Sequence, residues 1–188
     1  MKSNRCLKIS KYLSYHLRHH PEELGLELAP GGWVEVEKLL AACLEAQFPL
    51  TREELEEVVT NNDKQRFSFD QTKTLIRANQ GHSVPVDLQL TSLAPPEILY
   101  HGTSTKAVPS ILSQGLLKMA RHHVHLSTTI EAARKVGQRQ GKPVVFELDA
   151  AAMYQAGYQF FVSENGVWLV ETVPPAYLRQ IYPLLVTI

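Results

Sequence analysis

The sequence predicts a two-lobed α+β protein, and three observations support this fold class. Apolar residues recur at helical spacing across residues 4–59, whereas short strand-like apolar runs dominate from residue 98 onward. Between these halves, residues 84–96 contain Val-Pro-Val-Asp and Ala-Pro-Pro, a composition typical of a linker. With 188 residues, 44% of them hydrophobic and 20% charged, the chain can bury one core or two small ones. We therefore expect an N-terminal lobe at residues 1–88 and a C-terminal lobe at 96–188.

The N-terminal half predicts three helices followed by a hairpin. Ile9, Leu13 and Leu17 recur at every fourth position, so residues 4–19 form an amphipathic helix that Pro21 ends. The elements expected after it are a helix following the Pro30-Gly31-Gly32 turn and Trp33–Val36, a helix opened by a Thr51/Glu54 capping box, and strands at 66–69 and 74–78. This order is typical of a winged-helix module.

The C-terminal half predicts a strand-rich lobe. The expected elements are strands at 98–100, 124–127 and 144–148, helices at 106–114 and 130–139, and a hairpin of 159–162 with 167–172 around the turn at 164–166. Gly115 is suited to end the first of these helices, and Pro109 must lie in its first turn.

Composition restricts the environment and the partners of the protein. Nineteen basic residues balance nineteen acidic ones, so net charge does not favour coating of a nucleic-acid duplex. Cys6 and Cys43 are the two cysteines and form no metal-finger spacing, which indicates free thiols in a reducing compartment. Neither a signal peptide nor an 18-residue apolar run is present. We expect a cytoplasmic monomer without a membrane segment.

Arginine and histidine gather in separated segments, three of which contain an arginine. Arg18 and His19 end the first predicted helix, Arg66 begins a strand, and Arg121 leads the run RHHVHLS. Fixed cations combined with titratable imidazoles favour an anion site, most plausibly for phosphate. Each segment alone has an ordinary explanation: cations stabilise a helix C-terminus, and an arginine at an edge strand is usually a solvated charge.

The segment His101-Gly102-Thr103 closes a predicted strand and is a second indication of a ligand. Glycine lets a ligand approach the backbone, and threonine offers a hydroxyl and an amide to phosphate or ribose. A plain turn after the strand explains the same residues equally well.

A metal site is the rival interpretation of RHHVHLS. His123 and His125 share one strand face, and His122 or His101 could complete a set of three ligands. No carboxylate or cysteine is near in sequence, and Arg121 would repel a dication, so we expect no metal. The glycine-rich loops of P-loop and Rossmann proteins are absent from the sequence as well.

Taken together, these segments resemble the RNA 2′-phosphotransferases (tRNA 2′-phosphotransferases) over nearly the whole chain. Their shared order and spacing make the resemblance specific. The matching segments are KISKYLSYHLRHHP (8–21), GGWVEVEKLL (31–40), NDKQRFSF (62–69), IRANQGHS (76–83), LYHGTS (99–104), ARHHVHLS (120–127) and GVWLVETVP (166–174).

The resemblance implies a winged-helix N-terminal lobe and a C-terminal lobe of the ADP-ribosyltransferase type, with NAD as co-substrate. The implied reaction removes an internal RNA 2′-phosphate, such as one left by tRNA splicing. The phosphate attacks the nicotinamide ribose, which gives an ADP-ribosylated 2′-phosphate intermediate and free nicotinamide. Transesterification then gives 2′-hydroxyl RNA and ADP-ribose 1″,2″-cyclic phosphate.

The resemblance also implies roles for particular residues. The family's catalytic set maps onto Arg18, His19, Arg66 and Arg121, with His19 as the member that exchanges a proton. The implied NAD-binding residues are His101, Gly102, Thr103, His125, Leu126 and Ser127, and the implied RNA or phosphate contacts are Asn62, Lys64, Gln80 and His82. Many ADP-ribosyltransferases place a glutamate near the acceptor, but here that strand reads Val167-Trp168-Leu169, and Glu171 is given no such role.

Two other functions compete with this prediction. An ADP-ribosyltransferase that caps terminal phosphates of RNA or DNA would leave a stable adduct in place of dephosphorylated RNA. A catalytically inactive winged-helix nucleic-acid binder would bind independently of NAD and release no nicotinamide.

Overall fold

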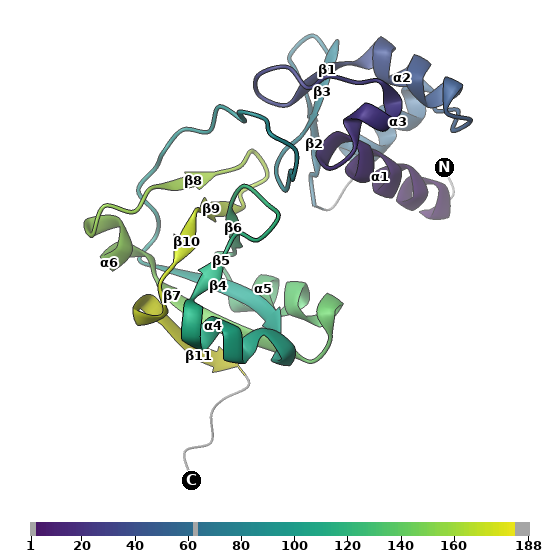
Figure 1. The fold of residues 1–188 in the computed structure, drawn as a ribbon. Helices are drawn as coiled ribbons and strands as arrows, with labels where there is room; N and C mark the ends of the chain where they lie inside the picture. Colours follow the sequence, from purple (N-terminus) through teal and green to yellow (C-terminus); the bar gives the residue numbers. More distant parts are fainter. Residues whose placement is uncertain (1–2, 62–63, 183–188) are drawn as a thin grey trace. The chain divides into compact units, whose positions relative to one another are not determined.

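The computed structural model describes residues 3–61 and 64–182 and divides into two compact units, Met1–Leu90 and Thr91–Ile188 (Figure 1). We call them the N-terminal unit and the C-terminal unit. Each combines helices with antiparallel sheet around a hydrophobic core of its own, so the predicted α+β class is confirmed. The boundary falls within the predicted linker at 84–96. Within the described ranges, no helix is both long enough and apolar enough to cross a bilayer.

The N-terminal unit contains the three predicted helices and the predicted hairpin. Its elements are α1 (Ser3–Arg18), η1 (Pro21–Leu24), β1 (Trp33–Glu35), α2 (Val36–Glu45), α3 (Arg52–Thr60), β2 (Phe67–Phe69) and β3 (Leu75–Ala78). The capping box at α3 is present, since the Glu54 N–H donates to Thr51 Oγ1 at 3.2 Å. The strands form an antiparallel sheet in the order β1-β3-β2. The sequence did not predict β1, and classification of the lobe as winged-helix stays a prediction.

One face of α1 is buried, and the end of the helix is held by a backbone hydrogen bond. Ile9, Leu13 and Leu17 are fully buried in the core of the N-terminal unit. Each such side chain contributes roughly 1.5–3 kcal/mol of hydrophobic stabilisation. The helix ends at Arg18, whose carbonyl accepts the N–H of Ser83 at 2.9 Å. The end of α1 is thereby joined to the chain that follows β3.

The C-terminal unit is richer in strands. Its elements are β4 (Ile98–Ser104), η2 (Thr105–Ala107), α4 (Val108–Gln114), β5 (Leu116–Leu117), β6 (Val124–Leu126), α5 (Ile130–Gly137), η3 (Gln138–Gln140), β7 (Pro143–Asp149), α6 (Ala150–Gln155), β8 (Phe160–Val162), β9 (Trp168–Val170), β10 (Thr172–Val173), η4 (Pro175–Tyr177) and β11 (Leu178–Tyr182). All predicted strands and helices of this half are present, including the β8–β9 hairpin. The sequence missed β5, α6, β10 and β11.

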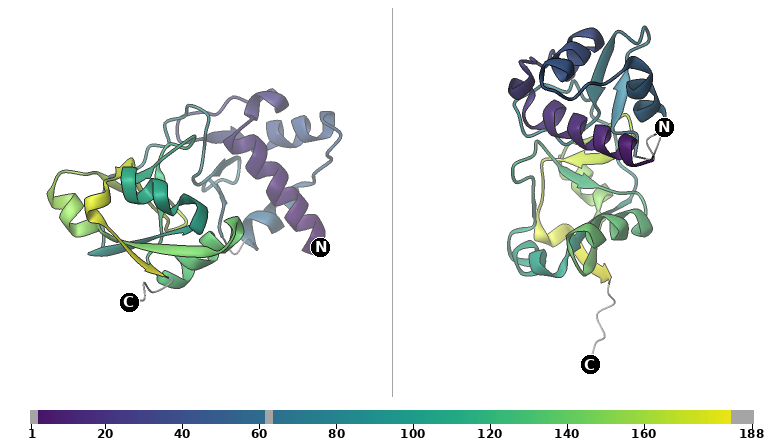
Figure 2. Two further views of the ribbon diagram at one scale, coloured as in Figure 1. Left: turned by 60° about the horizontal axis from the view of Figure 1, so that its bottom comes forward. Right: turned by 90° about the vertical axis from the view of Figure 1, so that its right-hand side faces the viewer.

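Three antiparallel sheets organise this unit: β11-β7-β4, β6-β9-β8 and the short pair β10-β5. The first two are linked where Tyr100 of β4 and Ser127 exchange both backbone hydrogen bonds at 2.8 Å. Helix α5 packs along β4 and β7, as the views in Figure 2 show. The segments that carry the predicted NAD-binding residues are therefore neighbours.

Glycine is required where α5 meets β4. A Cβ built on Gly102 would collide with the backbone carbonyl of Ala133, and one on Gly137 would collide with the carbonyl of Thr103. Packing of α5 against this face is thus a second reason for glycine at 102, which the sequence did not predict. Assignment of Gly102 to the cofactor site stays a prediction.

We expect Gly102→Ala to destabilise the C-terminal unit. The added methyl group meets backbone atoms that cannot rotate away, so the free energy of unfolding should fall by about 1–3 kcal/mol or more. Thermal unfolding of the variant checks this. The control is Leu112→Ala at a side chain that is 57% exposed, where little change is expected. Equal melting temperatures for the Gly102 variant and the wild type would contradict the packing described.

Candidate functional site

Arg18 lies at the end of α1 against the beginning of β2. Its Nη2 donates to the carbonyl oxygen of Arg66 at 3.5 Å, and its Cζ lies 6.0 Å from the centroid of the Phe67 ring. Both contacts are long, and they place the guanidinium beside the backbone from which the Arg66 side chain emerges. Two permanently charged side chains thus originate from adjoining points, although α1 and β2 are far apart in sequence.

His19 follows Arg18 and is oriented by a serine from another segment. Its Nδ1 lies 2.8 Å from Ser83 Oγ, and its own N–H continues the helical pattern by donating to Tyr15 O at 3.0 Å. The contact engages Nδ1. The predicted proton exchange of His19 stays a prediction, and it would fall to Nε2.

Arg66 is held through its backbone. Its carbonyl also accepts the N–H of Asn79 at 2.9 Å, and Asn79 Nδ2 donates to the carbonyl of Gln65 at 2.7 Å. Gln65 has a φ of +41°, in the left-handed region that L-residues seldom adopt. Asn79 therefore fixes two successive carbonyls at the entry to β2.

In the segment that follows β3, alternate residues contact different parts of the N-terminal unit. The Asn79 N–H donates to the Arg66 carbonyl, Gly81 lies beside the Arg18 guanidinium, and Ser83 Oγ contacts the His19 ring. By contrast, His82 is 1% exposed and its ring lies beside Gly32. Sequence reasoning selected the even-numbered Gln80 and His82 and missed the three odd-numbered residues. The segment IRANQGHS was the available signal, but it did not distinguish the two sets.

The other predicted substrate contacts are less constrained. Lys64 is exposed two positions before Arg66, and Gln80 is half-buried. Asn62 lies outside the described residues. Contact of any of these residues, or of the buried His82, with RNA stays a prediction.

In the C-terminal unit, a chain of contacts links His101, His125 and Arg121. His101 Nδ1 lies 3.1 Å from the carbonyl oxygen of His125, and Arg121 Nη1 lies 3.3 Å from His125 Nδ1. Because a guanidinium can only donate, His125 Nδ1 is the acceptor in the second contact. These contacts bring together the first residue of the His-Gly-Thr segment and the arginine that leads RHHVHLS.

The backbone of Gly102 faces an edge of β4. Tyr100 directs its N–H and C=O toward Ser127, and alternate residues of an antiparallel strand direct these groups to the same side. Gly102 therefore points its N–H and C=O toward this side, beyond the Tyr100–Ser127 bridge. Thr103 is 4% exposed, and Leu126 is buried in the core beneath β6.

The pKa of His101 is lowered from its ordinary value of 6.5, mainly by burial and also by Arg121, while the bond to the His125 carbonyl acts in the opposite direction. His101 is therefore neutral in the folded protein at a pH where the unfolded chain binds a proton. The contribution of neutral His101 to the free energy of unfolding should be fully present above about pH 6.5. It should be lost as the pH drops below that value toward the pKa of His101 in the folded protein.

Denaturant unfolding of the wild type and of His101→Asn, at about pH 7.5 and about pH 5.5, checks this prediction. The wild type should lose more stability on acidification than the variant. His123, whose pKa is also lowered by burial, contributes in the same direction to both proteins. Identical pH dependence of the two proteins would contradict a neutral buried His101.

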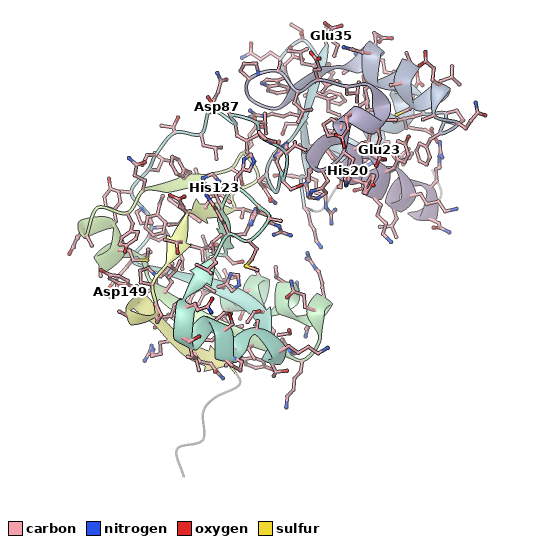
Figure 3. All side chains as sticks on the ribbon, viewed as in Figure 1. His20, Glu23, Glu35, Asp87, His123 and Asp149 are labelled. Carbon is pink, nitrogen blue, oxygen red and sulfur yellow. The ribbon has the colours of Figure 1, made fainter. Side chains whose placement is uncertain are left out.

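The ring of His123, which is labelled in Figure 3, lies 5.4 Å from that of Phe161. It borders a cleft of about 510 Å³ together with Lys118, which pairs with Glu171 at 2.9 Å. None of the predicted NAD-binding residues lines this cleft. Among the residues at 3–61 and 64–182, no three His, Cys, Asp or Glu side chains converge on a possible metal position.

His20 belongs to a cluster of side chains near the end of α1. Its Nδ1 lies 3.1 Å from Glu22 Oε1 and 3.7 Å from Glu23 Oε1, and Figure 3 shows His20 and Glu23 near the end of α1. Its ring also lies 4.7 Å from that of Tyr15. These contacts give His20 a structural role near the end of α1.

The structure thus groups Arg18, His19 and Arg66 in the N-terminal unit, and His101, His125 and Arg121 in the C-terminal unit. Joint action of Arg121 with Arg18, His19 and Arg66 stays a prediction.

Comparison with known proteins finds a matching family model and several similar sequences. Residues 4–172 match the family model described as RNA 2′-phosphotransferase, Tpt1/KptA family. The chain is 66% identical over 180 residues to a probable RNA 2′-phosphotransferase of Trichormus variabilis, covering 96% of this chain and 99% of that protein. A protein of the same name from Nostoc punctiforme is 62% identical over 96% of this chain and 100% of its own length. One from Streptomyces coelicolor is 52% identical over 95% and 97%, respectively.

Proposed function

Because the chain belongs to the RNA 2′-phosphotransferase family, we propose that it transfers an internal RNA 2′-phosphate to NAD. The products are RNA with a free 2′-hydroxyl, nicotinamide and ADP-ribose 1″,2″-cyclic phosphate. NAD is consumed as a co-substrate. Its role rests on the family resemblance and on how the residues described above suit such a ligand.

Arg18 and Arg66 bind the 2′-phosphate in this scheme. Guanidinium groups remain charged at any physiological pH and offer bidentate hydrogen bonds to phosphate oxygens. They neutralise the phosphate, orient it, and stabilise the additional charge as phosphorus becomes five-coordinate. The family resemblance also assigns Arg121 to the catalytic set, as a further guanidinium for the reaction. No metal ion is needed for these tasks.

His19 provides the proton transfer. It is the member of the set whose ordinary pKa allows protonation and deprotonation near neutral pH. In the second step, a ribose hydroxyl attacks phosphorus and the RNA 2′-oxygen leaves. The hydroxyl proton must be removed, and the leaving oxygen must receive one. The fixed orientation of the ring by Ser83 suits it for this exchange.

The C-terminal unit has groups suited to NAD. The backbone N–H and C=O of Gly102 can pair with a carboxamide at the edge of β4. The neutral His101, held by the His125 carbonyl, can hydrogen-bond to ribose without adding charge. Thr103 of β4, His125 and Leu126 of β6, and Ser127, which follows β6 and bridges to Tyr100 of β4, complete the proposed set.

The observation that carries the proposal is the assembly of Arg18, His19 and Arg66 at one place, from segments 48 positions apart in the case of the two arginines. A cation pair with an adjacent imidazole is what transfer of a phosphoryl group requires.

Nicotinamide release tests the proposal and separates it from phosphate capping. The protein is incubated with NAD and one of three otherwise identical oligonucleotides, carrying an internal 2′-phosphate, a terminal 5′-phosphate or no such phosphate. The proposal expects release with the internal 2′-phosphate. Release with the 5′-phosphate alone, together with an ADP-ribosylated product, would favour capping. Release with none of them would contradict both functions.

A further inference from the structure

We propose that the segment Asn79–Ser83 is a positioning element, in which Asn79 fixes Arg66 and Ser83 fixes His19. The inference rests on the proposed function and deepens it, because it assigns a role to residues outside the catalytic set. These residues act on the phosphate through Arg66 and His19.

Asn79 is suited to hold the entry to β2. It is 5% exposed, its backbone N–H donates to the Arg66 carbonyl at 2.9 Å, and its Nδ2 donates to the Gln65 carbonyl at 2.7 Å. Among the described residues its Oδ1 is buried without a hydrogen-bond partner, so the side chain serves here as a donor. Retaining a buried amide for one donated bond indicates that this bond matters.

The conformation of Gln65 explains why such a bond is needed. A φ of +41° is unfavourable for a residue with a side chain and persists only when neighbouring contacts impose it. Loss of the Asn79 donor would let Gln65 relax toward ordinary backbone angles. The Arg66 side chain, which emerges from the next Cα, would then point in a different direction.

Ser83 holds both the end of α1 and the His19 ring. Its N–H donates to the Arg18 carbonyl at 2.9 Å, and its Oγ lies 2.8 Å from His19 Nδ1. The backbone bond fixes where α1 ends, and the side-chain bond fixes the rotation of the ring. One residue thus determines both position and orientation of the imidazole.

Two residues between Asn79 and Ser83 also contact other parts of the N-terminal unit. Gly81, with a φ of +90°, lies between the two donors, and a Cβ there would be 3.6 Å from Arg18 Nη1. His82 is 1% exposed and lies beside Gly32. The two ends of the segment therefore contact the neighbourhood of the functional residues differently: Asn79 holds the backbone of Gln65 and Arg66, and the Ser83 side chain contacts the His19 ring.

Four variants test the proposal. Ser83→Ala removes the hydroxyl, Ser83→Thr retains it, and Asn79→Asp keeps the shape of the side chain while removing its donor. Ile76→Val is the control, because Ile76 is fully buried in β3 and its replacement destabilises the same unit without touching Arg66 or His19. For each protein we would measure kcat, the KM for NAD, the melting temperature, and the Kd ratio of 2′-hydroxyl to 2′-phosphorylated trinucleotide without NAD.

Misplacement of a catalytic group by a fraction of an ångström to an ångström lowers the rate strongly. We expect kcat to fall about ten- to a hundred-fold in Ser83→Ala and Asn79→Asp, with the KM for NAD unchanged. Ser83→Thr should recover most of the loss. Ile76→Val should lower the melting temperature and leave kcat unchanged.

The outcomes separate this inference from the proposed function. Wild-type kcat in both Ser83→Ala and Asn79→Asp overturns the inference and leaves the function intact. If the wild type does not turn over but prefers the 2′-phosphate, and the two variants lose that preference, the positioning role is upheld and the enzymatic function is overturned. A wild type with neither turnover nor preference overturns both.

Discussion

Replacing Arg66 by alanine should lower kcat by about 10²–10³-fold, or roughly 2.7–4 kcal/mol of transition-state stabilisation. The Arg66 carbonyl accepts from the Asn79 N–H and from Arg18 Nη2, so the backbone from which its charged guanidinium side chain emerges is held in place. Alanine removes that charge and leaves these backbone bonds in place. The fall should therefore appear in kcat with a small change in melting temperature.

Two further variants make this test specific. Arg66→Lys retains a charge but loses the bidentate fork, so its kcat should lie between those of the wild type and the alanine variant. Arg52→Ala removes an arginine of the same unit that pairs with Glu37 and Glu56 on the surface, and should leave kcat unchanged. Wild-type turnover in Arg66→Ala would remove this residue from the proposed chemistry.

Arg121→Ala should lower kcat by a comparable factor of about 10²–10³. Arg121 is exposed, and its side chain contacts His125 at 3.3 Å, so the variant should fold normally. The loss should therefore reflect the absence of the Arg121 guanidinium from the proposed reaction. Steady-state kinetics with the 2′-phosphorylated oligonucleotide and thermal unfolding measure the two quantities separately.

Arg139→Ala is the matched control for Arg121, because Arg139 is an exposed arginine of the same unit, in η3. It should retain wild-type kcat. Should Arg121→Ala behave like this control, Arg121 would have no part in phosphate transfer, and the proposed assignment would be wrong for the C-terminal unit.

The sequence predicted the elements that a regular pattern or a strong local signal defines. Residues 4–19 carry three apolar side chains at helical spacing, and the Thr51/Glu54 capping box marks the start of α3. The β8–β9 hairpin has an Asn-Gly turn between two apolar runs. In each case the information lies within a few neighbouring residues, where it can be read without knowledge of the fold.

The elements that were missed depend on partners distant in sequence. Strand β1 has three residues, too few to show a period, and exists because it pairs with β3. The two-residue strands β5 and β10 define each other across 55 positions. Strand β11 was likewise unassigned and lies beside β7.

The functional residues also divide into those that their chemistry reveals in the sequence and those that only contacts in the folded chain reveal. Arginine and histidine are recognisable by their chemistry, so Arg18, His19, Arg66 and Arg121 could be selected from the sequence. Asn79 and Ser83 are residue types common in ordinary turns, and only the hydrogen bonds in the folded chain show what they hold. Gly102 was selected, but its packing against α5 was not predicted.

The fate of the phosphorus atom distinguishes transfer to NAD from every other loss of the 2′-phosphate. An oligonucleotide carrying ³²P in one internal 2′-phosphate is incubated with the protein, with and without NAD, and the labelled products are identified by chromatography and mass. We expect the label to leave the RNA only when NAD is present and to appear in ADP-ribose 1″,2″-cyclic phosphate. Label that stays on the RNA, or that appears as inorganic phosphate without NAD, would overturn the proposed reaction.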